Sequence, residues 1–321
     1  MAVAAQARTR RILIWAGLLV TVVFGWIAIQ DVHAQAVWEA LKESNYAWTI
    51  PAVLALAVAI VLRAVRWQYV FERETRPPFG PTLRALLVGY LFNNILPVRA
   101  GEAIRVVALY RYAGTSRAES AATVVAERLY DVLTLLVLFF ATLPWLPHVA
   151  RIKITVWLAI CVVLAIVVTA VVLIKWEHRP IEWVLRPVVR IPFLSSLDAQ
   201  RLALSATQGL ASLRRGGLAL AAFVLTLVSW IALAFSAWFV MIAFDLGLSP
   251  AAGVLVVVAT GLASTLPSSP AGLGVFEGAT VVALGAYGVP RSEALSYALV
   301  LHAVNFFPFL VAGVVALRWR S

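Results

Sequence analysis

Two asparagines and three charged residues interrupt an otherwise apolar stretch of the sequence, GYLFNNILPVRAGEAIR, at residues 89–105. Ionised groups at membrane depth are unfavourable unless they are paired or hydrated, so they mark candidate functional positions. A guanidinium is permanently charged and can bind a phosphate through two hydrogen bonds. The stretch therefore predicts half of an anion-binding site, with a second interpretation in which its arginines only face the cytoplasmic interface. The predicted binding residues are Asn93, Asn94, Arg99, Glu102 and Arg105.

A second group of charges lies in ERLYD at residues 127–131. Glu127 and Asp131 are four residues apart and Arg128 and Asp131 three apart, so all three can share one helix face. Two carboxylates beside one arginine compensate each other's charge. The pattern predicts a buried charge network, and it is equally compatible with a role for Arg128 in binding an anion.

The third group lies in STLPSSPAGLGVFEG at residues 264–278. Hydroxyl groups offer neutral hydrogen bonds, and a helix restarting near Leu273 would aim its N-terminal amides at an anion. We predict that Ser268, Ser269 and Glu277 belong to the same anion site. In the last apolar segment, His302 and Asn305 are three residues apart and are predicted to join the charge network.

The composition requires a membrane environment for these groups. The 321 residues are 63% hydrophobic and only 13% charged, with a mean hydropathy of +0.93, whereas soluble domains carry about a quarter charged residues. We predict a single all-α integral membrane domain over residues 1–321. The six long apolar segments expected to cross the membrane are residues 12–30, 47–70, 118–143, 154–174, 217–246 and 292–317.

Shorter segments interrupted by glycine and proline lie between the long ones. Residues 85–97 would rise about 20 Å as a helix, which is too short for a hydrocarbon core of about 30 Å. This predicts a first re-entrant hairpin at about 85–112. A second hairpin is expected at about 250–289, and its arms could cross partly or completely. The fragments NILPVRAGEAIR and TLPSSPAGLGVFE resemble each other, so we predict an inverted repeat whose broken helices meet near the membrane midplane.

Lysine and arginine predict the orientation, since cytoplasmic loops are enriched in both. They are concentrated near the two termini and in residues 63–117 and 175–215, whereas the opposite side holds Lys42, Arg151, Lys153 and Arg291. Both termini are therefore expected in the cytoplasm, in a multi-pass protein of the cell membrane. Residues of about 176–216 are expected to form an amphipathic stretch at the cytoplasmic interface or a solvated linker.

Several functional classes lack sequence support. The net charge of +11 comes from basic residues between membrane segments, so no nucleic-acid partner is expected. The single cysteine and four scattered histidines show no metal-ligand spacing. No phosphate-binding loop and no serine-hydrolase motif occurs. We therefore predict no catalytic residue, no metal and no cofactor.

Three motifs, NNILPVRAGEAIRVVAL, ERLYDVL and STLPSSPAGLGVFEGA, resemble the flippase-like transmembrane domain family of the lysylphosphatidylglycerol synthases, in the family's order. The resemblance covers most of the chain from about residue 50. It implies a membrane protein that moves or handles lipids, often anionic or modified phospholipids, hopanoids or glycolipid carriers. In the full synthases a soluble C-terminal domain transfers lysine from charged tRNA to phosphatidylglycerol. This chain stops at Ser321 directly after its last helix, so we expect a stand-alone member without enzymatic activity.

One departure from the family concerns headgroup preference. Relatives often carry an arginine in the final helix where this chain has His302, which replaces a fixed charge by a titratable one. The first hypothesis is a flippase-like transporter that binds an anionic phospholipid or lipid-linked headgroup between the hairpins, with acyl chains left in the bilayer. The second is an accessory membrane subunit that presents lipid to a separate glycosyltransferase or aminoacyl-transfer enzyme. The third, a lipid-modifying enzyme, lacks a nucleophile beside a base. The sequence does not predict an oligomeric state.

Overall fold

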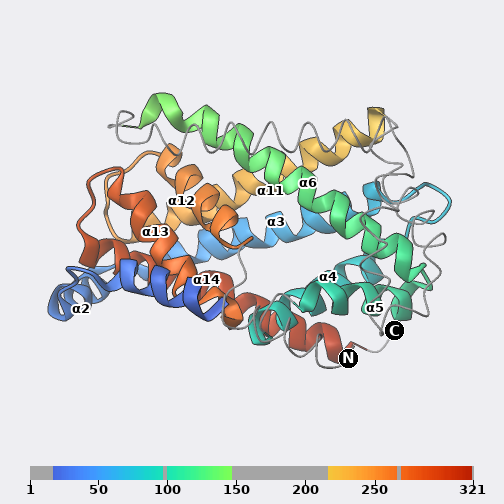
Figure 1. Ribbon diagram of the computed structural model, residues 1–321, viewed down its shortest axis with the longest axis horizontal. Coiled ribbons are helices and arrows are strands. Elements are labelled where there is room, and N and C mark those ends of the chain that lie inside the picture. The colour runs from blue at the N-terminus through green and yellow to red at the C-terminus, as the bar shows by residue number, and fades with distance from the viewer. Residues whose placement is uncertain (1–16, 97–99, 147–215, 266–268, 320–321) are drawn as a thin grey trace, which may run out of the picture.

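The computed structural model describes residues 17–96, 100–146, 216–265 and 269–319, and these residues form helices and connecting turns without any strand (Figure 1). The prediction of an all-α membrane protein is thus confirmed. The four longest helices are α3 (Thr49–Val70), α6 (Arg117–Thr142), α11 (Gly216–Ala243) and α14 (Arg291–Arg318). Among the described helices, α3 (extended by the turn at Tyr46), α11 and α14 are long and apolar enough to cross a membrane singly. The 26-residue α6 also has the necessary length, and its three carboxylates, Glu119, Glu127 and Asp131, are buried.

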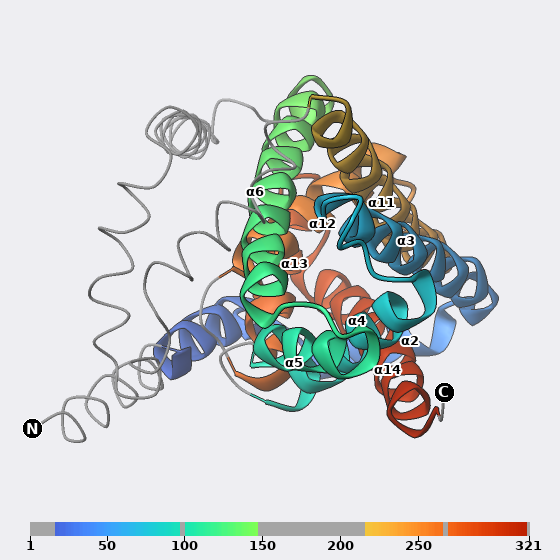
Figure 2. The same ribbon diagram turned by 90° about the vertical axis from the view of Figure 1, so that its right-hand side faces the viewer.

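Helices α3 and α11 pack side by side along their length in both ribbon views (Figures 1 and 2). Small residues make this close approach possible, because lipid provides no hydrophobic force to hold two membrane helices together. Ala52, Ala59 and Ala64 on α3 are buried, as are Ala222 and Ala237 on α11. This pair forms one wall of the bundle, and α6 and α14 pack beside it.

The first predicted hairpin consists of α4 (Phe79–Ile95) and α5 (Gly101–Ala113). It begins at Phe79 instead of about residue 85, and Arg84 lies within helix α4. The Arg84 guanidinium stacks on Tyr112 at 3.9 Å and donates to the carbonyl of Ala316 at 2.8 Å. The two arms touch where Gly101 faces Gly89, and a Cβ added at Gly101 would come within 2.0 Å of the Gly89 carbonyl oxygen.

The second hairpin consists of α12 (Pro250–Ala263), the 3₁₀ turn η5 (Pro270–Gly272) and α13 (Val275–Gly285). With 14 and 11 residues, its arms rise about 21 and 16 Å, less than the core thickness of about 30 Å. The helix lengths therefore support a second hairpin that enters the membrane only partly. Three residues with positive φ, Ala271, Gly272 and Gly274, turn the chain at the tip.

The two hairpins lie toward opposite ends of the bundle, and η5 at the tip of the second contacts α4 of the first (Figure 1). This is the arrangement expected for an inverted repeat with its broken helices meeting inside the membrane. Helices α3, α6 and α11 surround the point where the two hairpins meet, and each of them contacts helices of the hairpins.

The N-terminal part contains an element that the sequence analysis did not predict. The helix Gly17–Ile29 is followed, after a bend of 78°, by the amphipathic helix α2 (Ala34–Glu43). The chain before α2 docks on α14 through the amide of His33, which donates to the hydroxyl of Ser292 at 3.0 Å. The predicted segment 154–174 lies outside the described residues, as does the predicted interfacial segment at 176–216 apart from Gly216.

Candidate functional site

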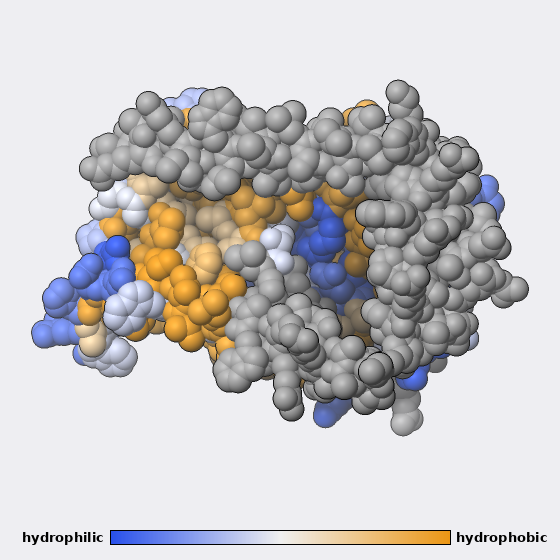
Figure 3. Space-filling view, viewed as in Figure 1, coloured by the Kyte–Doolittle hydropathy of each residue, from blue (hydrophilic) through white to orange (hydrophobic). Residues whose placement is uncertain are grey.

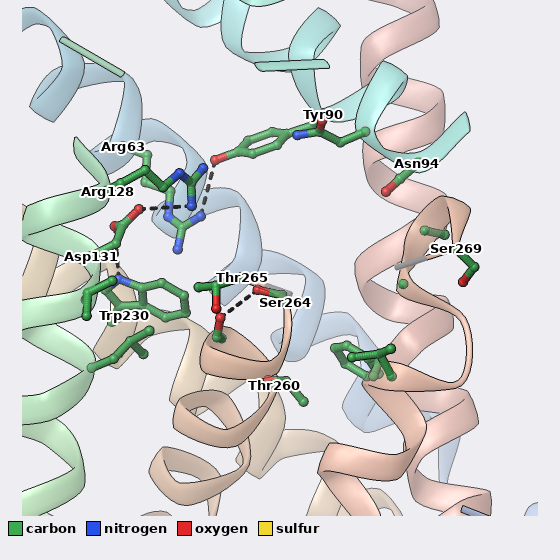
Figure 4. A pocket seen from close by; sticks show the side chains of 18 of the residues that line it. Arg63, Tyr90, Asn94, Arg128, Asp131, Trp230, Thr260, Ser264, Thr265 and Ser269 are labelled. Atoms are coloured by element: carbon green, nitrogen blue, oxygen red, sulfur yellow. Dashed lines mark hydrogen bonds and ion pairs between the residues drawn. The ribbon is translucent and has the colours of Figure 1, made fainter. Parts of the chain in front are cut away.

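A polar cavity of about 220 Å³ lies where the tips of the two hairpins meet the long helices. Figure 4 shows charged side chains of α3 and α6 on one side and Asn94 and Ser269 of the hairpin tips across from them. Figure 3 shows hydrophilic residues gathered in a recess of one face of the molecule, beside a largely hydrophobic area. The polar and aromatic lining residues of the cavity include Arg63, Tyr90, Asn93, Asn94, Arg128, Asp131, Trp230, Thr260, Ser264, Thr265 and Ser269.

Arg63, on α3, is the cation with the fewest partners in this lining. Its Nη1 donates to the Tyr90 hydroxyl at 3.3 Å, and its guanidinium lies 4.5 Å from the centre of the Trp230 ring. Its Nε and Nη2 atoms are buried without a hydrogen-bond partner among the described residues, and no ion pair of Arg63 is found there. A buried guanidinium with free donors is an unsatisfied group that an anion would satisfy.

Behind the cavity, a buried ion network joins α3, α5 and α6. Arg66 donates to Glu127 at 2.9 Å and to Asp131 at 2.6 Å, and Arg105 donates to the other oxygen of Glu127 at 2.6 Å. The Arg105 guanidinium also lies 4.7 Å from the Trp67 ring. Because buried charges need partners, this network fixes the first hairpin against α6.

Arg128 connects that network to the cavity. Its Nη2 pairs with Glu102 at 2.8 Å and its Nη1 with Asp131 at 3.5 Å, and the side chain is 39% exposed. Asp131 also accepts a hydrogen bond from the Trp230 indole at 3.2 Å, so one carboxylate positions two cavity-lining residues. The positive charge of Arg128 is therefore already balanced by two carboxylates.

The hairpin tips contribute neutral polar groups. The Oδ1 atom of Asn93 is buried without a hydrogen-bond partner in the described parts of the chain, and Asn94 donates to the carbonyl of Phe306 at 3.4 Å. The Ser269 amide donates to the Thr21 hydroxyl at 3.0 Å, and its hydroxyl donates to the carbonyl of Leu273. These groups can add hydrogen bonds to a ligand without adding charge.

Glu277 and His302 form a separate buried pair between α13 and α14. Glu277 also accepts the amide proton of Gly274 at 2.7 Å and so caps the first turn of α13. Neither residue lines the cavity, but the intervening Phe276 does, and its ring lies 4.8 Å from that of His302. Asn305, one turn further along α14, donates to the carbonyl of Leu301.

The structure thus separates the predicted site residues into two layers. Those that line the polar cavity are Asn93, Asn94, Arg128, Asp131 and Ser269, whereas Arg105, Glu127, Glu277 and His302 lie behind it. Arg99 and Ser268 lie outside the described residues. Among residues 17–96, 100–146, 216–265 and 269–319, no group of three or more His, Cys, Asp or Glu side chains is placed to hold a metal ion.

Sequence reasoning missed Arg63 and Arg66, which it assigned to the cytoplasmic flank of residues 47–70. Helix α3 continues to Val70, so both arginines lie within it, one turn apart. The signal that could have identified them is that both arginines fall inside the apolar segment 47–70, where a charged residue is a candidate functional position.

Comparisons with known proteins agree with this architecture. Residues 14–313 match the family described as the lysylphosphatidylglycerol synthase TM region. A "UPF0104 membrane protein" of Methanothermobacter thermautotrophicus is 23% identical over 299 residues, which cover 88% of each chain. "Glycosyltransferase AglD" of Haloferax volcanii is 27% identical over 128 residues, which are 40% of this chain and 20% of that protein. The chain therefore belongs to the family of the lysylphosphatidylglycerol synthase transmembrane region.

Proposed function

We propose that the protein binds the anionic headgroup of a membrane lipid in the polar cavity and moves the lipid between the two leaflets. The observation that carries this proposal is Arg63, whose Nε and Nη2 donors are buried in the membrane region without a partner among the described residues. Such a group is strongly unfavourable in a low-dielectric site unless a ligand or water satisfies it. A phosphate matches the planar geometry of its donors.

The charges around the cavity indicate how much negative charge the ligand carries. The arginines are Arg63, Arg66, Arg105 and Arg128, and the carboxylates linked to them are Glu102, Glu127 and Asp131. Among the described residues, four positive charges face three negative charges, which leaves one to be balanced. A phosphodiester with a single net negative charge satisfies this balance, and a doubly charged phosphomonoester exceeds it.

The position of the cavity supports movement between leaflets. Along α3, Arg63 lies about 21 Å from Thr49 and about 10 Å from Val70, so a bound headgroup would lie within the membrane. The hairpins that line it come from opposite ends of the bundle, and their arms stop short of a full crossing. Movement of one hairpin would open the cavity toward one leaflet, and movement of the other toward the opposite leaflet, as in alternating access.

The test is a flipping assay in proteoliposomes with fluorescent phosphatidylglycerol, in which an impermeant reductant removes the label from the outer leaflet. Arg63→Gln should slow flipping by about tenfold or more, because hydrogen bonds to a charged group contribute about 1.5–3 kcal/mol. The matched control is Arg117→Gln, an exposed arginine at the start of α6. Equal rates for the wild type and Arg63→Gln would refute the assignment.

The match to AglD favours a second candidate function. A region homologous to 128 residues of this chain occurs within a longer protein named as a glycosyltransferase. In this alternative the protein binds lipid in the same cavity and presents it to a separate membrane enzyme. Stoichiometric co-purification of such an enzyme, together with no flipping by the isolated protein, would favour this function over transport.

A further inference from the structure

A second, mainly apolar cavity of about 170 Å³ adjoins the polar one. The two cavities share Arg63, Tyr90, Trp230 and Phe276 in their linings, so they meet at the unpaired guanidinium. Beyond this junction, the wall is built from aliphatic and aromatic side chains of α3, α11, α12 and α14. They include Leu56, Ile60, Leu233, Val257, Leu301 and Phe309.

Away from Arg63, the described lining of this second cavity offers few free polar groups to a ligand. Asn305, a polar residue that lines this cavity and not the polar one, donates its side-chain amide to the carbonyl of Leu301 at 2.8 Å. The hydroxyl of Thr260, which lines both cavities, donates to the carbonyl of Val256 at 2.8 Å. Water gains few hydrogen bonds in such a space, and apolar cavities of this kind stay dry or take up apolar molecules.

We infer that the apolar cavity holds the first part of an acyl chain of the lipid whose headgroup binds at Arg63. The inference rests on the proposed function and adds to it, because the polar and apolar parts of the ligand must join at the junction of the two cavities. Its phosphate lies at the junction, and a hydrocarbon chain runs from there into the protein. This differs from the expectation that all acyl chains stay in the bilayer.

The size of the cavity limits how much of the chain it takes. An apolar cavity of about 150 Å³ has room for benzene, so this one accommodates about six carbon atoms. Each buried methylene contributes about 0.8 kcal/mol, which corresponds to about a fourfold gain in affinity. The rest of the chain continues into the bilayer.

The experiment measures binding of a series of singly charged phosphodiesters, from dimethyl phosphate to methyl octyl phosphate, by calorimetry, with the full-length protein held in amphipol. Affinity should rise about fourfold per methylene and level off near six carbons. Leu233→Trp fills the apolar cavity and should abolish the chain-length dependence while leaving dimethyl phosphate binding unchanged. The matched control, Leu220→Trp, alters an exposed position on the same helix α11 and should behave as the wild type.

The outcomes separate this inference from the proposed function. Affinity that is independent of chain length, but still weakened by Arg63→Gln, overturns the acyl cavity and leaves the headgroup site intact. A chain-length dependence that persists in Leu233→Trp also overturns it, because the alkyl chains then bind elsewhere. If no alkyl phosphate binds in an Arg63-dependent way, the headgroup site fails as well. The wild-type series decides the question even if Leu233→Trp does not fold.

Discussion

The two hairpins meet at the same cavity but are held in the protein by different forces. The first hairpin, α4–α5, is fixed by charge, because Arg105 pairs with Glu127 and Glu102 pairs with Arg128 on α6. In the second hairpin, residues 250–285, Glu277 is the only charged residue. The second hairpin is held instead by close backbone contacts, helix caps and hydroxyl groups. For example, a Cβ added at Gly278 would come within 2.5 Å of the Phe24 carbonyl oxygen.

This difference shows that the charges of the hairpins serve mainly to hold them in place. The described hairpin residues that face the polar cavity, such as Asn93, Asn94 and Ser269, are neutral. The unpaired cation comes from α3, one of the long helices. We therefore expect changes in the network to act on stability, changes at Arg63 to act on lipid binding, and the first hairpin to be held more firmly than the second.

The largest expected effect is the loss of the arginine that anchors the first hairpin's network. Arg66→Met removes a partner from both Glu127 and Asp131 while they remain buried, and should reduce the free energy of unfolding by about 3–5 kcal/mol. Thermal unfolding in detergent measures it, with Arg117→Met as the exposed control. An unchanged melting temperature would show that charge does not hold this hairpin.

Glycine-to-alanine substitutions test the close backbone contacts of both hairpins. Gly101→Ala places a methyl group against the Gly89 backbone of the first hairpin and should destabilise the protein by about 1–3 kcal/mol. Gly278→Ala meets the Phe24 backbone at a less severe distance and should have a smaller effect. The control is Gly285→Ala, which has open space around it and should be neutral or slightly stabilising. The melting temperatures of the three variants show whether the destabilisation decreases in this order.

The single carboxylate of the second hairpin is expected to act as a cap and partner for His302. Glu277→Ala leaves the Gly274 amide and the His302 ring without that partner, and should lower the free energy of unfolding by about 1–3 kcal/mol. Glu277→Gln keeps one acceptor oxygen for one of the two partners, and should lose less. If the two variants unfold at the same temperature, the hydrogen bonds are not what stabilises this hairpin.

The smallest expected effect is at the neutral tip groups. Asn93→Ala and Ser269→Ala each remove one neutral polar group from the cavity and should slow lipid flipping by about two- to tenfold, as expected for a neutral hydrogen bond of about 0.5–1.5 kcal/mol. Melting temperatures should stay close to that of the wild type. A loss as large as that of Arg63→Gln would mean that the tips contribute more than neutral hydrogen bonds.

Much of this arrangement could be predicted from the sequence, because hydropathy and segment length have direct structural consequences in a membrane. The segment before Pro97 was predicted to be too short to cross, the segments around Pro270 were predicted to form a second hairpin, and the structure describes both hairpins as paired short arms. The ERLYD motif was correctly assigned to one helix face. What was missed was the role of Arg63 and Arg66, which a rule based on charge counted among the cytoplasmic residues 63–117 although both also lie in the predicted segment 47–70.

The amphipathic helix α2 was also missed, because it contains no long apolar run and its polar residues are typical of a loop. Its position depends on contacts with α14, more than 250 residues away, such as that between His33 and Ser292. A sequence pattern alone does not identify such a partner.

The sequence by itself determined that the chain is helical, that it lies in a membrane and that two broken segments carry polar tips, since each follows from local composition and helix rise. Only the tertiary structure decided how the charges are distributed. Glu102, Glu127 and Asp131 balance Arg66, Arg105 and Arg128, while Arg63 keeps free donors at the junction of a polar and an apolar cavity. Charge compensation depends on distances of a few ångströms between different helices, and those distances are set by packing.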